Sequence, residues 1–260
     1  MSPLRRGGGE GRDPIGPGRP ALVVVAHGSR DPRSAATVSE VVSAVAAARP
    51  ELDVYPAFLD LNAPSVERAV DAVAAAGHTA AVAVPLLLGS AFHARVDLPG
   101  LLAAARTRHP FLHCTQADVL GADPRLVTAL RDRVRATGAD PRDPRVGVAV
   151  AAVGSSSPAA NDRTRRLARP LVAGTAWRAE VCFATTEPTL PETISRLRAR
   201  GCQRVVIAPW FLAPGRLTDR LHGAAGPHPF AAPLGAHPAL VDVVLERYTN
   251  AVSLPLPLSA

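Results

Sequence analysis

The sequence predicts an α/β protein made of two similar parallel-sheet units in tandem. Short apolar runs of the buried-strand type alternate with longer stretches of helical periodicity. That order favours a parallel sheet with helices on both faces. The pattern then repeats after a turn-rich break. With 260 residues, 47% of them hydrophobic, the chain is long enough to build a core in each unit.

The first unit is predicted to occupy residues 20–140 and to alternate four strands with four helices. Its first run, ALVVVA, is continuously apolar, as expected of a strand buried on both faces. Pro64 and Pro124 suit the first turn of a helix. Strands are expected at 21–26, 53–59, 79–88 and 112–117. Helices are expected at 34–48, 64–76, 96–108 and 123–137.

The second unit is assigned to residues 141–252, with short segments outside both units. Residues 1–19 are rich in Gly, Pro and Arg and are predicted to be a disordered tail, and residues 253–260 form a second tail. The start lacks the apolar core and cleavage signature of a secretory signal, and no apolar run reaches the roughly 18 residues of a membrane helix. A cytoplasmic protein with no membrane partner is therefore expected.

An internal repeat defines the second unit. Residues 64–88 align without gaps on 188–212, and residues 120–133 align on 234–247. In addition, HGS at 27–29 corresponds to VGS at 153–155. Two copies imply a pseudo-twofold pair with a cleft between its halves, and small-molecule sites favour such clefts. We expect a monomer in which one chain supplies both halves.

The composition excludes several classes of chemistry. All 29 basic residues are arginine, so no lysine is present to form a Schiff base, to hold pyridoxal phosphate or to complete a P-loop. The net charge is +7, but the arginines are scattered, aromatic residues make up only 4% and no recognition motif is present, so nucleic acid is not an expected partner. Cys114, Cys182 and Cys202 are far apart in apolar runs, which gives no support for a cysteine-bound metal.

Two histidines distinguish the first unit from its duplicate. His27 follows the first strand directly, and its counterpart is Val153. His93 lies five residues after the run PLLL, and its counterpart is Leu217. Both histidines should lie just beyond the carboxyl ends of parallel strands, where ligands bind in open α/β sheets. A strand order of the flavodoxin type would bring their two loops together.

Two neutral imidazoles can hold a divalent cation such as Fe²⁺, Co²⁺, Ni²⁺ or Zn²⁺, and they can also accept protons near neutral pH. A carboxylate would assist either role. Asp60 ends the second strand at the same edge, and Asp97 follows His93 by four residues. Helix capping or a solvated surface position explains either carboxylate equally well, so the choice between the two stays open.

Three motifs resemble the sirohydrochlorin chelatase family in its long, duplicated form. They are AHGSRDPRS (26–34), FLDLNAPSV (58–66) and PLLLGSAFHARVDLP (85–99). The resemblance covers about residues 21–251 and implies a class II chelatase fold, in which two flavodoxin-like units face one central cleft. The family includes cobaltochelatases of cobalamin synthesis and ferrochelatases of sirohaem synthesis. It implies a tetrapyrrole partner, a divalent metal as substrate (Co²⁺ or Fe²⁺, with Ni²⁺ as a third option) and no nucleotide.

The same resemblance implies roles for individual residues. His27 and His93 match the two active-site histidines: one would hold the metal together with Asp60, and the other would take a proton from the macrocycle. Asp60 stands where the family often carries an acid, although it is the shorter carboxylate. Since the second unit lacks both histidines, one active site per chain is expected. The residues expected to bind carboxylates on the rim of the substrate are Ser29, Arg30, Arg33 and Arg95.

Other functions stay open at this point. A non-catalytic cobalt- or nickel-binding protein would use the same two histidines without turning over a tetrapyrrole. A phosphoryl-transfer enzyme would use His27 as nucleophile beside Arg30, but it would need more phosphate-binding glycines. A purely structural domain needs neither histidine. The metal itself is not selected by the sequence, because Fe²⁺, Co²⁺ and Ni²⁺ all accept imidazole and carboxylate ligands.

Overall fold

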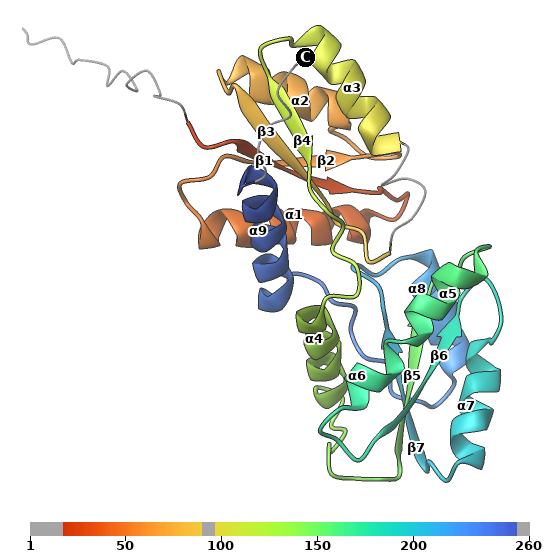
Figure 1. Ribbon diagram of the computed structural model, residues 1–260. Coiled ribbons are helices and arrows are strands. Elements are labelled where there is room, and N and C mark those ends of the chain that lie inside the picture. Colours follow the sequence, from red (N-terminus) through yellow and green to blue (C-terminus); the bar gives the residue numbers. More distant parts are fainter. Residues whose placement is uncertain (1–17, 90–96, 254–260) are drawn as a thin grey trace, which may run out of the picture.

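The structure is a computed structural model that describes residues 18–89 and 97–253 (Figure 1). Most strands and helices lie within a few residues of their predicted positions. The strands are β1 (Ala21–Ala26), β2 (Val54–Phe58), β3 (Ala80–Pro85), β4 (His113–Gln116), β5 (Val146–Ala152), β6 (Arg178–Phe183) and β7 (Arg204–Pro209). The helices are α1 (Pro32–Ala48), α2 (Val66–Ala75), α3 (Leu98–Arg108), α4 (Pro124–Arg135), α5 (Pro158–Arg165), α6 (Ala168–Val172), α7 (Leu190–Ala199), α8 (Arg216–Ala225) and α9 (Pro238–Ser253).

The described strands form two parallel sheets. Sheet A has the order β2-β1-β3-β4, and sheet B has the order β6-β5-β7. The order of sheet A is the flavodoxin-type order that would bring the loops after β1 and β3 together. In sheet B, a single parallel bridge between Ile207 and Phe230 stands beside β7, where sheet A has its fourth strand. The two-sheet architecture confirms the predicted fold class.

Some boundaries differ from the predicted ones. The Ser65 hydroxyl caps α2 by accepting a hydrogen bond from the backbone N–H of Arg68 at 3.4 Å. The helix therefore begins at Val66, and Pro64 lies before it and not in its first turn. Ser253 is the last residue of α9 and not the start of a tail. The rest of the predicted C-terminal tail, and residues 1–17 of the N-terminal one, lie outside the described residues. No helix within 18–89 and 97–253 is long and apolar enough to cross a membrane.

Alternate side chains of each strand enter different cores, as the period of two in a strand requires. On β1, Leu22 and Val24 are buried in a cluster with α1 and α9, whereas Val23 and Val25 pack with α2 and α3. Sheet B repeats the arrangement, since Ala149 and its alternate neighbours pack against α7 and α8. Every residue of β1 is buried, which explains why its sequence is continuously apolar.

The two sheets exchange a helix. Helix α4 follows sheet A in the chain but packs against β7 and α6, and α9 follows sheet B but packs against β3 and α1 (Figure 1). The guanidinium of Arg133 on α4 donates to the carbonyl of Leu234 at 2.7 Å, and that of Arg247 on α9 donates to the carbonyl of Leu120 at 3.4 Å. These pairs occupy equivalent positions of the repeat, so the exchange is reciprocal.

One consequence is that a single apolar core runs from sheet A through the exchanged helices to sheet B. Each sheet therefore packs against one helix that comes from the other half of the sequence. The ranges 20–140 and 141–252 describe the duplicated halves of the chain and stay a prediction as independent domains.

Candidate active site at the edge of sheet A

His27 and Asp60 leave the carboxyl ends of neighbouring strands. β1 and β2 pair in parallel as far as Ala26 and Phe58. The backbone N–H of Asp60 then donates to the carbonyl of His27 at 3.0 Å, which holds the two residues beside each other. Both residues are exposed. The structure therefore brings an imidazole and a carboxylate to one edge of the sheet, where a ligand can reach them.

The loop after β1 fits closely against the loop after β2. Gly28 has a φ of +97°, and a Cβ built on it would lie 1.8 Å from the carbonyl oxygen of Asp60. The backbone N–H of Ser29 donates to the side-chain oxygen of Asn62 at 2.7 Å. The Ser29 hydroxyl accepts a hydrogen bond from the backbone N–H of Asp31 at 3.1 Å. Ser29, predicted to bind substrate, thus has a structural role in fixing this loop.

The segment after β3 starts from the same edge. β3 pairs with β1 as far as Pro85, and the N–H of Leu86 donates to the carbonyl of Val25 at 2.8 Å. The predicted site residues His93 and Arg95 follow within 90–96, outside the described residues. Within the described part of the chain, no three His, Cys, Asp or Glu side chains gather as metal ligands. The predicted ligand set of His27, His93 and Asp60 stays a prediction.

Asp97 is the other candidate for the acidic partner. It is the residue immediately before α3, at the N-cap position, but its side chain makes no capping hydrogen bond there. Helix capping, one of the two alternatives to a functional role, therefore does not account for this carboxylate. Asp60 and Asp97 both stay candidates.

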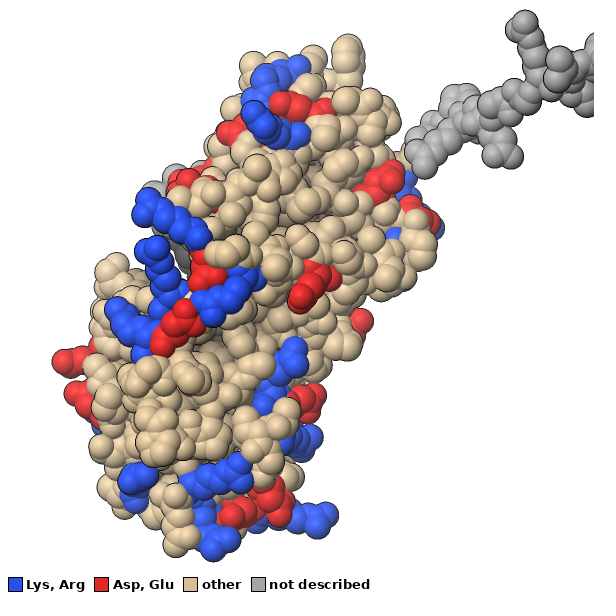
Figure 2. Space-filling model, turned by 180° about the vertical axis from the view of Figure 1, so that it is seen from behind, with Lys and Arg blue, Asp and Glu red and all other residues tan. Residues whose placement is uncertain are grey.

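Arg33, predicted to bind substrate, joins the two units through its ion pair with Asp219. Its guanidinium lies 2.6 Å from the Asp31 carboxylate and 2.5 Å from that of Asp219. Arg33 is in the first turn of α1, after β1, and Asp219 is in the first turn of α8, after β7. The carboxyl edges of the two sheets therefore meet at this pair. Figure 2 shows acidic and basic side chains gathered where the two units meet.

Arginines dominate the electrostatics of this junction. Hydrogen bonds from the side chain and the backbone of Arg33, with a smaller contribution from the charge of Arg216, lower the pKa of the Asp31 carboxyl to about 2. The bonds to Asp31 and Asp219 in turn raise the pKa of Arg33. Both carboxylates thus compete with any anionic ligand for Arg33. Arg30, in the same loop, is exposed.

The second unit has the same backbone arrangement with different side chains. The N–H of Thr185 donates to the carbonyl of Val153 at 3.0 Å, as that of Asp60 does to His27. Thr185 is therefore the counterpart of Asp60, and its hydroxyl donates to the same carbonyl at 2.8 Å. Sequence alignment missed this correspondence because its gap-free part begins only at Pro64. At these two positions the second unit offers neither an imidazole nor a carboxylate.

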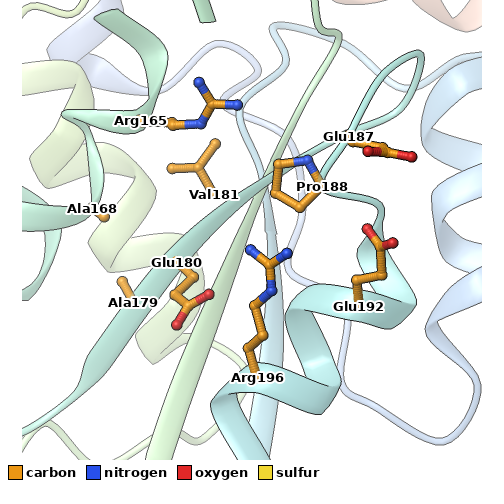
Figure 3. A pocket seen from close by; sticks show the side chains of 9 residues that line it. All are labelled: Arg165, Ala168, Ala179, Glu180, Val181, Glu187, Pro188, Glu192 and Arg196. Carbon is orange, nitrogen blue, oxygen red and sulfur yellow. The ribbon is translucent and has the colours of Figure 1, made fainter. Parts of the chain in front are cut away.

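Two surface hollows lie on the second unit and contain none of the predicted site residues. The first lies beside β6, where Arg196 lies between Glu180 and Glu192 and Arg165 lies near Val181 (Figure 3). Two of its three carboxylates have partners: Glu180 accepts from Arg200 at 2.9 Å, and Glu192 accepts from the N–H of Thr189 at 2.8 Å. The second lies beyond the carboxyl end of β6. Its lining residues are Phe183, Ala184, Thr185, Thr186, Glu187, Thr189 and Arg220.

Comparison with known proteins places the chain among chelatases. The family described as CbiX matches residues 21–137 and 147–251. A sirohydrochlorin cobaltochelatase of Priestia megaterium is 27% identical over 244 residues, covering 87% of this chain and 78% of the relative. A sirohydrochlorin ferrochelatase of the same organism is 28% identical over 206 residues, covering 77% and 76%.

A solved structure, SirB from Bacillus subtilis with Fe³⁺, shares the fold with a TM-score of 0.78. The match covers 90% of this chain and 96% of that one at 24% sequence identity, so it supports the fold alone. The family match, in contrast, rests on the sequence and spans both halves of the duplication. The chain therefore belongs to the CbiX family of sirohydrochlorin chelatases.

Proposed function

We propose that this protein inserts Co²⁺ or Fe²⁺ into sirohydrochlorin. Family membership supports the reaction class, and both metals occur in the names of the relatives. The observation that carries the proposal is the asymmetry between two otherwise similar sheet edges. One edge has His27 beside Asp60, and the other has Val153 beside Thr185. A scaffold function would give no reason for this difference.

The reaction needs a metal-binding group and a proton acceptor. When M²⁺ enters the macrocycle, two pyrrole N–H protons leave, so the overall charge is balanced. We assign metal binding to one of His27 and His93 together with a carboxylate, Asp60 or Asp97, and proton acceptance to the other histidine. Both roles require neutral imidazoles. His27 and Asp60 are both exposed at the carboxyl edge of sheet A, as residues that contact a bound substrate must be.

Substrate carboxylates are assigned to Ser29, Arg30, Arg33 and Arg95. Arginine binds carboxylates in a forked geometry, and the rim of the substrate carries many of them. The hydrogen bond from the N–H of Ser29 to Asn62 fixes the backbone of this loop. Ser29 would therefore act by holding the loop in position for the substrate. Arg33 is held by Asp219, and a rim carboxylate of the substrate would take the place of that residue.

Asp219→Asn tests the role of Arg33. Both partners are about half exposed, so loss of the ion pair should change the free energy of unfolding by no more than about 1 kcal/mol. The KM for sirohydrochlorin should fall, because a competing carboxylate is removed. The measurements are steady-state kinetics and thermal unfolding. An unchanged or higher KM would show that substrate carboxylates do not replace Asp219 on Arg33.

The decisive experiment for the function is direct. Purified protein is mixed with sirohydrochlorin and Co²⁺ or Fe²⁺, and the absorption spectrum is followed against a protein-free control. A chelatase accelerates the conversion to the metallated spectrum. The runner-up, a non-catalytic cobalt- or nickel-binding protein, would bind the metal and leave the rate at that of the control.

A titration with Co²⁺ should show one tight site per 260-residue chain. Only the first unit has a histidine and a carboxylate at its sheet edge, and Val153 and Leu217 cannot ligate a metal. Isothermal calorimetry on wild type and on His27→Ala measures the stoichiometry. Two equivalent tight sites, one of which persists in the variant, would show that the second unit has its own metal centre.

We also propose that the protein acts as a monomer in the cytoplasm. The second unit supplies the facing wall of the cleft within one chain, so a partner copy is not needed to complete the site. Sedimentation equilibrium of the active protein would test this, and a dimer required for activity would contradict it.

A further inference from the structure

Leu61 lies beside the candidate active site. Neither metal binding nor proton transfer explains its exposed apolar side chain or its backbone conformation. It follows Asp60 directly and is 51% exposed. Its φ is +63°, and it is the only non-glycine residue in the described part of the chain with a positive φ. The left-handed region suits Gly and Asn, and a bulky leucine there is an outlier. One exposed leucine needs no explanation, but an exposed leucine in a strained backbone conformation points to a function.

Hydrogen bonds on both sides impose this conformation. The carboxylate of Asp60 accepts from the N–H of Leu61 at 2.7 Å. The carbonyl of Asp60 accepts from the N–H of Asn62 at 2.7 Å, and the side chain of Asn62 binds the N–H of Ser29. The loop is thus fixed against the segment that carries His27. The next residue, Asn62, is of a type that tolerates a positive φ. The positive φ nevertheless occurs at Leu61 and not at Asn62.

The duplicate shows that the fold does not need this residue. Both loops close in the same way, because the N–H of Phe58 binds the carbonyl of Pro64 and the N–H of Phe183 binds that of Pro188, each at 2.9 Å. The loop that this contact closes is one residue shorter in the second unit than in the first. The extra residue and its positive φ therefore occur only in the half that has His27.

We propose that Leu61 is a substrate-contact residue that packs on the flat face of the macrocycle and positions it over His27. The inference rests on the proposed function. A carboxylate-rimmed tetrapyrrole presents charges at its edge and an apolar conjugated face, so arginines alone cannot position it. Among the described residues, Leu61 is the one large apolar side chain that is strongly exposed at the carboxyl edge of sheet A. The rigid loop holds it in place before the substrate arrives.

Leu61→Gly separates substrate contact from structure. Glycine adopts positive φ freely, so the Tm of the variant should not fall. The Kd for metal-free sirohydrochlorin, measured in chelator-treated buffer, and the KM should both rise about five- to tenfold. The kcat at saturation should stay within about twofold, since the metal and proton groups are untouched. Leu61→Met, which retains an apolar side chain of similar size, should bind like wild type.

Phe111→Ala is the matched control. Phe111 is 88% exposed and lies between α3 and β4, at the amino edge of sheet A, so its loss should not change Kd or KM. A wild-type protein that neither binds nor metallates sirohydrochlorin would reject the proposed function before any variant is compared. An active wild type with an unchanged Kd in Leu61→Gly would overturn the role of Leu61 alone. A fall in Tm together with weaker binding in both Leu61 variants would also overturn it, because the residue would then be structural.

Discussion

Replacing His27 by Ala is expected to abolish most metal insertion and to leave the fold intact. Removal of a general base or a ligand costs about 10²-fold or more in rate. His27 is exposed, so its truncation opens no cavity in the core. The measurement is the rate of Co²⁺ insertion into sirohydrochlorin, with the Tm as a check on folding. His93→Ala is expected to have the same effect.

Two controls distinguish this loss from a general effect of surface substitution. Val153→Ala changes the equivalent position of the second unit, where the side chain is 44% exposed, and should retain the wild-type rate. His113→Ala removes an exposed histidine at the other end of sheet A, on β4, and should do the same. If His27→Ala and His93→Ala both insert metal at rates near that of wild type, the site assignment is wrong.

Local features of the fold could be predicted because their causes are local. The continuous apolar run of β1 reflects burial on both faces, and its predicted bounds match those observed. His237 corresponds to Asp123 in the repeat, and this position predicts a cap or turn residue at the start of a helix. In the structure its Nδ1 accepts a hydrogen bond from the N–H of Ala239 at 3.2 Å. Such contacts span only two residues, so sequence spacing is enough to find them.

Features that depend on tertiary packing could not be predicted in the same way. Periodicity shows that α4 and α9 each have an apolar face, but it does not tell which sheet that face covers, so the helix exchange was missed. The ion pair of Arg33 and Asp219 joins residues 186 positions apart. The correspondence of Thr185 with Asp60 depends on a loop that differs in length by one residue, and backbone hydrogen bonds were needed to align it.

Gly28→Ala is expected to damage both stability and catalysis. Alanine at a φ of +97° is strained, and its Cβ would lie 1.8 Å from the carbonyl oxygen of Asp60, which as a backbone atom cannot rotate away. The loop after β2 must move, and this weakens the bond from Asp60 to His27 and the bond from Ser29 to Asn62. Strain and the two hydrogen bonds together amount to about 2–5 kcal/mol of unfolding free energy. Denaturant unfolding and insertion kinetics measure the two effects.

Gly154→Ala in the second unit is the matched control for this effect. Its φ is +93°, so the backbone strain is similar, but the added Cβ would meet side-chain atoms of Thr185 at 2.8 Å and of Thr186 at 2.9 Å. The Thr186 side chain can rotate away, but rotation of Thr185 breaks the hydrogen bond from its hydroxyl to the carbonyl of Val153, and the Cβ of Phe183 at 3.1 Å must shift slightly. Backbone strain and that one hydrogen bond amount to an expected loss of about 1.5–3.5 kcal/mol. The kcat should stay near that of wild type, because no catalytic group adjoins Gly154. If Gly28→Ala is folded and inserts metal as fast as Gly154→Ala, the close fit between the loops of His27 and Asp60 is not required for catalysis.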